Sequence, residues 1–121
     1  MAYQKATTDD VASVVPEEWG GMWFLKKPLG TEHLGVSIFE LEPDGRGREH
    51  DEADSGQEEV YVCVRGEATV ELGEDTVVLH ENEALRVDPG QRRQVFNRGD
   101  ERFTLVVVGA PTSAAEPNPG E

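Results

Sequence analysis

The stretch Glu59-Val60-Tyr61-Val62-Cys63-Val64-Arg65-Gly66 decides the fold of this chain. Its β-branched and aromatic residues predict a strand, and the glycine after Arg65 predicts where that strand ends. Further along, a second punctuated strand, Leu85-Arg86-Val87-Asp88-Pro89-Gly90, precedes the segment from Gln91 to Asn97. This two-part layout predicts a small β-barrel with polar side chains gathered at its mouth.

Strand signals recur on both sides of this stretch and predict an all-β fold. Turn residues separate the segments, among them Pro43-Asp44-Gly45 and Gly73-Glu74-Asp75. The expected strands are Trp19–Leu25, Gly35–Leu41, Glu59–Val64, Ala68–Leu72, Thr76–Leu79, Ala84–Val87, Gln94–Phe96 and Arg102–Val108. Closely spaced strands of this kind are typical of a sandwich or a barrel.

The chain has 121 residues, which is enough for one domain with a real core and too few for two. We expect residues 1–30 to form an N-terminal arm that packs on the barrel or on a partner subunit. Residues 31–110 should form the barrel, within which the polar segment 45–57 is expected to be flexible. Residues 111–121, rich in Pro and Ala, are predicted to be a disordered tail.

The formal net charge is −14. Such an acidic surface repels phosphate groups, so neither nucleic acid nor an anionic membrane is expected as a partner. High salt would screen the self-repulsion of this surface, so a salt-adapted source is one interpretation and an ordinary acidic soluble protein is the other.

Residues 1–10 lack the apolar core of a secretory signal, and no apolar run reaches the length of a membrane span. The single cysteine, Cys63, cannot form an internal disulfide, so the fold does not depend on oxidation. A cytoplasmic location follows as the expectation.

Between Val36 and Val108 the chain resembles the cupin superfamily, because two groups of residues keep the spacing of its two sequence motifs. The resemblance is to the small single-domain cupins of the conserved-barrel type. Six residues separate Glu59 from Gly66, as in the first motif, and Pro89 and Asn97 keep the spacing of the second. The resemblance implies a double-stranded β-helix, or jelly-roll barrel, and commonly a homodimer. It does not imply one activity, because this fold supports many.

Cupins that bind metal usually present three histidines and one glutamate inside the barrel. In this chain His50 and Glu59 match, whereas Glu52 stands at the second histidine position and Arg93 at the last. A second register, which places Arg48-Glu49-His50 on the first motif, also leaves one histidine. The resemblance therefore implies His50, Glu52 and Glu59 as ligands of one divalent ion, such as Zn, Mn, Ni or Fe.

The guanidinium group of Arg93 stays positively charged and offers only hydrogen-bond donors, so it cannot ligate a cation. If the barrel closes as the family's does, Arg93 lies close to Glu59 and replaces the charge of a metal by fixed protein charge. The alternative is that Arg93 points to solvent. In the first case Arg93, Tyr61 and His50 are the expected ligand-binding residues for a small polar or anionic molecule.

Three functions are compatible with these residues. The first is a cupin-type small-molecule-binding protein with a degenerate pocket, which holds its ligand without metal. The second is a metal-dependent enzyme of the oxygenase or isomerase class, which would need a bound ion because the sequence shows no nucleophile–base pair. The third is a structural or regulatory oligomer. No catalytic residue is assigned, and Cys63 is expected to be a buried structural residue rather than a reactive thiol.

Overall fold

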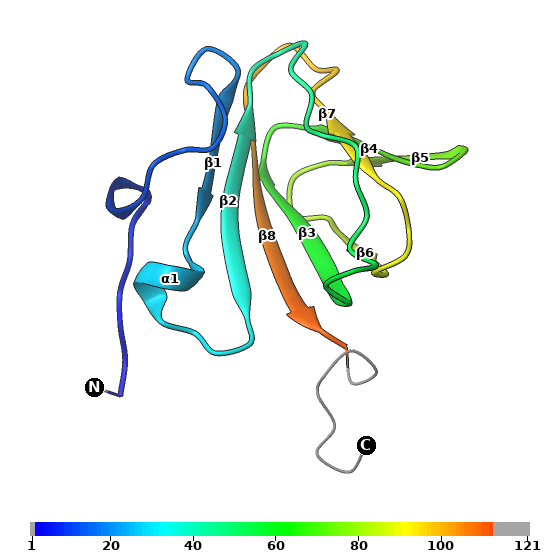
Figure 1. Cartoon of the computed structure of the whole chain (residues 1–121). Helices are drawn as coiled ribbons and strands as arrows, with labels where there is room; N and C mark the ends of the chain where they lie inside the picture. Colours follow the sequence, from blue (N-terminus) through cyan, green and yellow to red (C-terminus); the bar gives the residue numbers. More distant parts are fainter. Residues whose placement is uncertain (1, 113–121) are drawn as a thin grey trace.

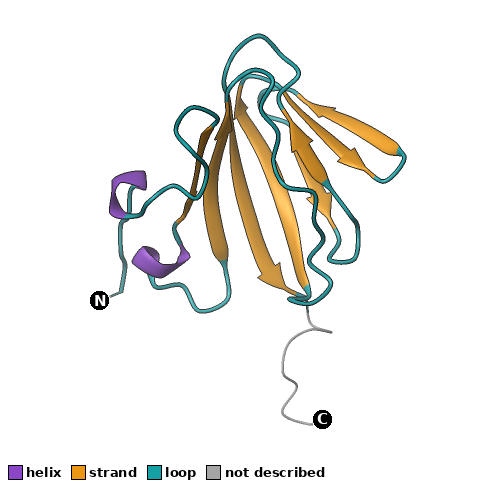
Figure 2. Ribbon diagram, turned by 45° about the horizontal axis from the view of Figure 1, so that its top comes forward, coloured by secondary structure: helices purple, strands orange, loops and turns teal. Residues whose placement is uncertain are grey.

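Two antiparallel β-sheets face each other in the computed structural model, which describes residues 2–112 (Figures 1 and 2). The larger sheet has the strand order β1-β2-β8-β3-β6, and the smaller sheet has the order β5-β4-β7. The strands are β1 (Gly20–Phe24), β2 (Gly35–Leu41), β3 (Gln57–Arg65), β4 (Ala68–Leu72), β5 (Asp75–Leu79), β6 (Ala84–Val87), β7 (Gln94–Phe96) and β8 (Phe103–Pro111). The all-β double-stranded β-helix is thereby confirmed.

The core lies between the inward faces of the two sheets. Strand β3 is paired with β8 on one side and with β6 on the other, and this register directs Tyr61 and Cys63 inward. Both side chains are almost completely buried. Around them pack inward residues of the other strands, including Phe39, Leu41, Val70, Val87, Val95, Phe103 and Leu105.

The segment from Gly45 to His50 runs beside β7, although the sequence predicts it to be flexible. Backbone hydrogen bonds join Gly47 to Val95, and His50 exchanges two bonds with Arg93, of 2.9 and 2.8 Å. The prediction is therefore wrong for this part of the segment. Backbone pairing overrides its polar composition, and it places His50 directly opposite Arg93.

Residues assigned to the N-terminal arm contribute an edge strand to the larger sheet, since β1 pairs with β2. The predicted helical turn before it is the 3₁₀ helix η1 (Thr8–Asp10), capped by the Thr7 side chain. A one-turn helix, α1 (Lys26–Leu29), has no counterpart among the expected elements. Both helices lie beside β1 (Figure 2). No helix among the described residues is long and apolar enough to span a membrane. The predicted tail lies almost entirely outside the described residues.

Asn97 joins the end of β7 to two other parts of the barrel. Its side chain is 1% exposed. Its amide nitrogen donates to the carbonyl oxygens of Leu41 at 2.8 Å and Glu101 at 2.9 Å. Its side-chain oxygen accepts from the backbone N–H of Gly99 at 2.9 Å. The asparagine is therefore a structural residue that holds the two sheets together at one end.

We predict that Asn97→Ala lowers the free energy of unfolding by about 2–4 kcal/mol, because three hydrogen bonds are lost and buried carbonyl groups lose their donor. Urea denaturation of the purified variant measures this change. Gln94→Ala is the control, since it removes a single side-chain bond to the Gly47 carbonyl. We expect about 1 kcal/mol for that control, and an equal or smaller loss in Asn97→Ala would contradict the assignment.

Candidate functional site

A cavity of about 480 Å³ opens into the barrel and has an apolar wall and a polar end. The apolar wall combines residues of the N-terminal arm with residues of the strands: Val14, Val15, Met22, Phe24, Phe39, Val95 and Val107. The polar end consists of Arg48, His50, Glu52, Glu59 and Tyr61. A pocket of this size and composition suits a small molecule with a polar group at one end.

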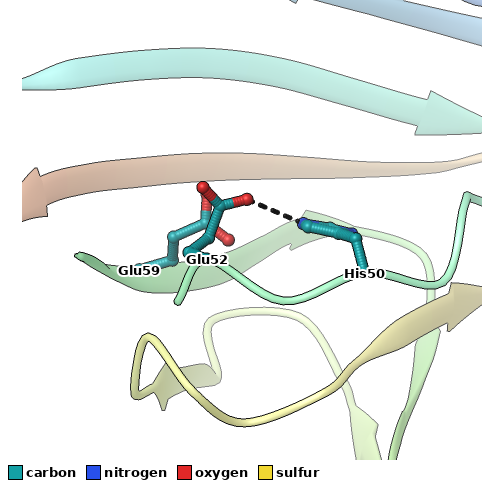
Figure 3. A group of neighbouring side chains, drawn as sticks. All are labelled: His50, Glu52 and Glu59. Atoms are coloured by element: carbon teal, nitrogen blue, oxygen red, sulfur yellow. Dashed lines mark ion pairs between the residues drawn. The ribbon is translucent and has the colours of Figure 1, made fainter. Parts of the chain in front are cut away.

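His50, Glu52 and Glu59 converge at the polar end. Glu59 comes from β3, whereas His50 and Glu52 come from the segment that follows β2, and Figure 3 shows the three side chains directed toward one another. One potential ligand atom of each residue lies within 4.8 Å of the other two. His50 Nε2 and Glu52 Oε2 lie 3.2 Å apart. The structure thus brings together all three residues proposed as metal ligands.

The ring of His50 is oriented by the backbone. Its Nδ1 lies 3.1 Å from the carbonyl oxygen of Arg48, so this nitrogen carries a proton and donates it. The Nε2 atom faces Glu52, with a lone pair when the ring is neutral and with a proton when the ring is charged. An imidazole lone pair and a carboxylate oxygen at 3.2 Å require a proton or a cation between or beside them. This is the arrangement in which a second hydrogen bond prepares a histidine to bind metal.

The hydroxyl group of Tyr61 donates a hydrogen bond of 3.0 Å to Glu59 Oε1. Burial raises the pKa of Tyr61 far above its ordinary value, and the negative charge of Glu59 raises it further. Tyr61 is therefore a neutral donor that fixes one oxygen of Glu59 and leaves the other carboxylate oxygen available at the pocket.

Arg93 approaches Glu59 but does not line the cavity. Its side chain is 0% exposed, which excludes the alternative that it points to solvent. The Nη2 atom lies 4.0 Å from Glu59 Oε1 and donates to the Asp88 carbonyl oxygen at 3.1 Å. Its Nε and Nη1 atoms have no hydrogen-bond partner among residues 2–112. The predicted approach of Arg93 to Glu59 is thus present, but its direct contact with a ligand stays a prediction.

The donor set fits a divalent cation. One imidazole and two carboxylates are ligands that Mn, Fe and Zn accept, and their present separation needs only a small contraction to reach coordination distance. The guanidinium of Arg93 repels a cation, but its Nη2 atom lies 4.0 Å from Glu59 Oε1, whose negative charge offsets that repulsion. The two carboxylates balance the charges of Arg48 and Arg93 when His50 is neutral, so a cation there would depend on direct ligation rather than on excess negative charge.

The one cysteine and the other two histidines do not belong to this group of potential metal ligands. Cys63 is completely buried, and burial raises the pKa of its thiol, as expected for an inert cysteine. His33 and His80 have largely exposed side chains outside the pocket. Val14 and Met22 line the cavity, which the sequence does not predict. An isolated apolar residue in the N-terminal arm carries no signal for the part of the barrel that it covers.

We predict that Tyr61 keeps its proton in the folded protein at pH values where a free tyrosine ionises, at about 10. The only other tyrosine is Tyr3, so the variant Tyr3→Phe isolates the signal. Its phenolate absorbance should be absent in the folded state and should develop on unfolding at the same pH. Because the pKa is raised in the folded state, this contribution to stability is complete below about pH 10 and is lost as the pH rises above it. Ionisation of Tyr61 in the folded variant near pH 10 would contradict its buried contact with Glu59.

Comparisons with known proteins agree with this architecture. The family model described as "Cupin domain" matches residues 37–109, more than half of the chain. A solved protein of Thermus thermophilus is 24% identical with a TM-score of 0.68, and the match covers 89% of this chain and 97% of that one. A cupin protein of Bacteroides fragilis is 21% identical with a TM-score of 0.73, covering 98% and 92%.

A third solved structure is a sugar phosphate isomerase from a cupin superfamily, from Silicibacter pomeroyi. It is 21% identical with a TM-score of 0.69, and the match covers 89% of this chain and 76% of that one. No protein of curated function matches the chain. At these identities the likeness to solved structures shows the fold alone.

Proposed function

The chain belongs to the cupin domain family, and on this premise we propose that it binds a small amphipathic molecule beside a divalent metal ion held by His50, Glu52 and Glu59. One observation carries the proposal. The three potential ligand atoms meet at the polar end of a cavity of about 480 Å³ whose remaining wall is mostly apolar. A metal ion there would supply a positive charge and open coordination positions for an oxygen-bearing group of the ligand.

The charges around the pocket favour a ligand with a polar or anionic head. With a divalent ion in place, the positive charges of Arg48, Arg93 and the metal exceed the negative charges of Glu52 and Glu59 by two. Arg93 acts on the ligand through this excess charge and through its approach to Glu59, 4.0 Å away. Tyr61 holds Glu59 in place by its hydrogen bond.

The apolar wall favours a ligand with a hydrocarbon body. Met22 and Phe24 of β1 and Val14 of the preceding segment line the cavity together with Phe39 and Val107. An apolar group placed against them is removed from water and gains about 25 cal/mol for each Å² that it buries. A purely polar ligand would leave this wall unused.

A metal-free pocket is the second candidate function, and the burial of Arg93 favours it. A guanidinium that is 0% exposed already supplies one permanent positive charge at 4.0 Å from Glu59. In that state a proton between His50 and Glu52 would take the place of the metal, and to hold the small molecule His50 or Tyr61 would exchange its bond to Glu52 or Glu59 for a bond to the ligand.

Metal content distinguishes these two functions. We predict that protein incubated with Mn or Zn and then freed of excess ion retains about one ion per chain, measured by inductively coupled plasma mass spectrometry. His50→Ala and Glu59→Gln should each reduce the affinity by about 10-fold to 100-fold or more, since each removes one ligand.

The matched control is His80→Ala. His80 also lies near two carboxylates, Glu67 at 3.5 Å and Glu83 at 3.2 Å, but its side chain is 64% exposed and lies outside the pocket. It should keep the full metal content. Protein that retains no ion with any of Mn, Fe, Ni and Zn would reject the metal centre and support the metal-free pocket, and equal loss in His80→Ala would show nonspecific binding.

The ligand class is tested with a matched pair of 2-oxo acids, pyruvate and phenylpyruvate, titrated calorimetrically into Mn-loaded protein. We predict that phenylpyruvate binds at least about 10-fold more tightly, because burying roughly 100 Å² of ring surface contributes about 2.5 kcal/mol before ordering costs. Phe24→Ala should reduce this preference and leave the metal content unchanged. Equal affinity for the two acids would contradict the role of the apolar wall.

A further inference from the structure

The segment that follows β2 divides its charged side chains between the cavity and the outer surface. Three alternate residues line the cavity: Arg48, His50 and Glu52. The two acids between them, Glu49 and Asp51, do not line it. Both lie near Arg92, whose Nη2 atom is 3.7 Å from a Glu49 oxygen and whose Nη1 atom is 3.7 Å from an Asp51 oxygen. The acids closest to Arg48 in the sequence are thus paired with a different arginine.

The two carboxylates of the cavity also have partners of their own. Glu52 Oε1 accepts a hydrogen bond of 2.8 Å from Ser55 Oγ, and Glu59 Oε1 accepts one of 3.0 Å from the hydroxyl group of Tyr61. Arg48 differs from both, because its side chain forms no hydrogen bond and no ion pair with any residue of 2–112. Within that range it is therefore the one charged side chain that lines the cavity and has no partner.

The backbone that carries Arg48 is held on both sides of the residue. Before it, the Gly47 N–H donates to the Val95 carbonyl oxygen at 2.8 Å, and the Gly47 carbonyl oxygen accepts from Gln94 Nε2 at 2.9 Å. After it, His50 Nδ1 lies 3.1 Å from the carbonyl oxygen of Arg48 itself. The residue is exposed although its backbone is fixed, so its guanidinium is accessible to a ligand that enters the cavity from solvent.

We propose that Arg48 binds the carboxylate group of a monocarboxylic acid whose hydrocarbon body packs against the apolar wall of the cavity. This inference rests on the proposed small-molecule pocket, but it does not require the metal ion. A guanidinium presents two parallel N–H donors that match the two oxygens of a carboxylate. In the metal-free pocket Glu52 and Glu59 repel an anion, which favours the arginine as the position of the carboxylate.

The rest of the cavity favours a single carboxylate over a dicarboxylate or a phosphate. Arg48 offers one positive charge, and a second negative charge on the ligand would face Glu52 or Glu59 without a partner in the metal-free pocket. Met22 and Phe24 instead offer apolar contacts, which suit a hydrocarbon body because its burial removes apolar surface from water. One anionic group with an uncharged body therefore matches the residues that line the cavity.

Calorimetric titration of the full-length chain with 3-phenylpropanoate and 3-phenylpropanamide tests the proposal, because the two ligands share one hydrocarbon body and differ in charge. The protein is first treated with a chelator, so that the acid has no metal ion to bind. We expect the acid to bind about 10-fold more tightly than the amide at low salt. This preference should shrink as NaCl is raised, because salt screens a charge pair at an exposed arginine.

Substitution of the arginine assigns the preference to one side chain. Arg48→Gln should lower the affinity for the acid to that for the amide, and Arg48→Lys should keep part of the preference, since it retains the charge but loses the paired donors. Arg46→Gln is the matched control. Arg46 is an exposed arginine of the same segment without an ion pair among residues 2–112, but it does not line the cavity, so this variant should keep the full preference.

The outcomes separate this proposal from the pocket on which it rests. Equal binding of acid and amide by the wild-type chain, a preference that Arg48→Gln retains, or an equal loss in Arg46→Gln would overturn the role of Arg48 and leave the pocket intact. Benzyl phosphate that binds more tightly than the acid, and loses this advantage in Arg48→Gln, would overturn the carboxylate assignment. Binding of neither acid nor amide, in chelator-treated and in Mn-loaded protein, would reject the small-molecule pocket and the role of Arg48 together.

Discussion

The two-residue alternation of β3, held in register between β8 and β6, is the constraint on which the rest of the molecule depends. It places Glu59, Tyr61 and Cys63 inside the barrel and the valines between them outside. A shift of one residue would exchange the two sets, and it would remove Glu59 from the pocket. Gly66 ends the strand with a φ of +77°, where a Cβ atom would lie 3.0 Å from the Arg102 carbonyl oxygen. Only glycine adopts this positive φ and tolerates the close carbonyl oxygen without strain.

The opposite half of the site depends on the backbone pairing of His50 with Arg93. This pair gives the two side chains the same inward direction, so the buried guanidinium and the imidazole both approach the glutamates. The electrostatics of the pocket follow from that placement. Arg93 neutralises one carboxylate, and the second carboxylate remains for a proton or a metal ion at His50. The arginine thus changes the charge of the site without blocking the positions of its three ligand atoms.

Most strands can be predicted from the sequence, because turn residues and apolar alternation mark their ends. The convergence of His50, Glu52 and Glu59 can be anticipated only through the family resemblance, since it depends on how distant segments pair. The order of the segment from Gly45 to His50 cannot be predicted, because its composition is polar and its partners are backbone groups of β7. The burial of Arg93 depends on the same pairing, so the sequence alone does not decide it.

The division of the pocket between two parts of the chain bears on what it can bind. The polar end comes from residues within 37–109, the part that matches the cupin domain model. The apolar wall is completed by Val14, Val15, Met22 and Phe24, which precede that part. Membership of the family therefore concerns the donors at the polar end, whereas the N-terminal arm completes the apolar wall against which the proposed ligand would pack. Substitutions in β1 should for this reason alter ligand preference, while those at His50 should alter the polar end alone.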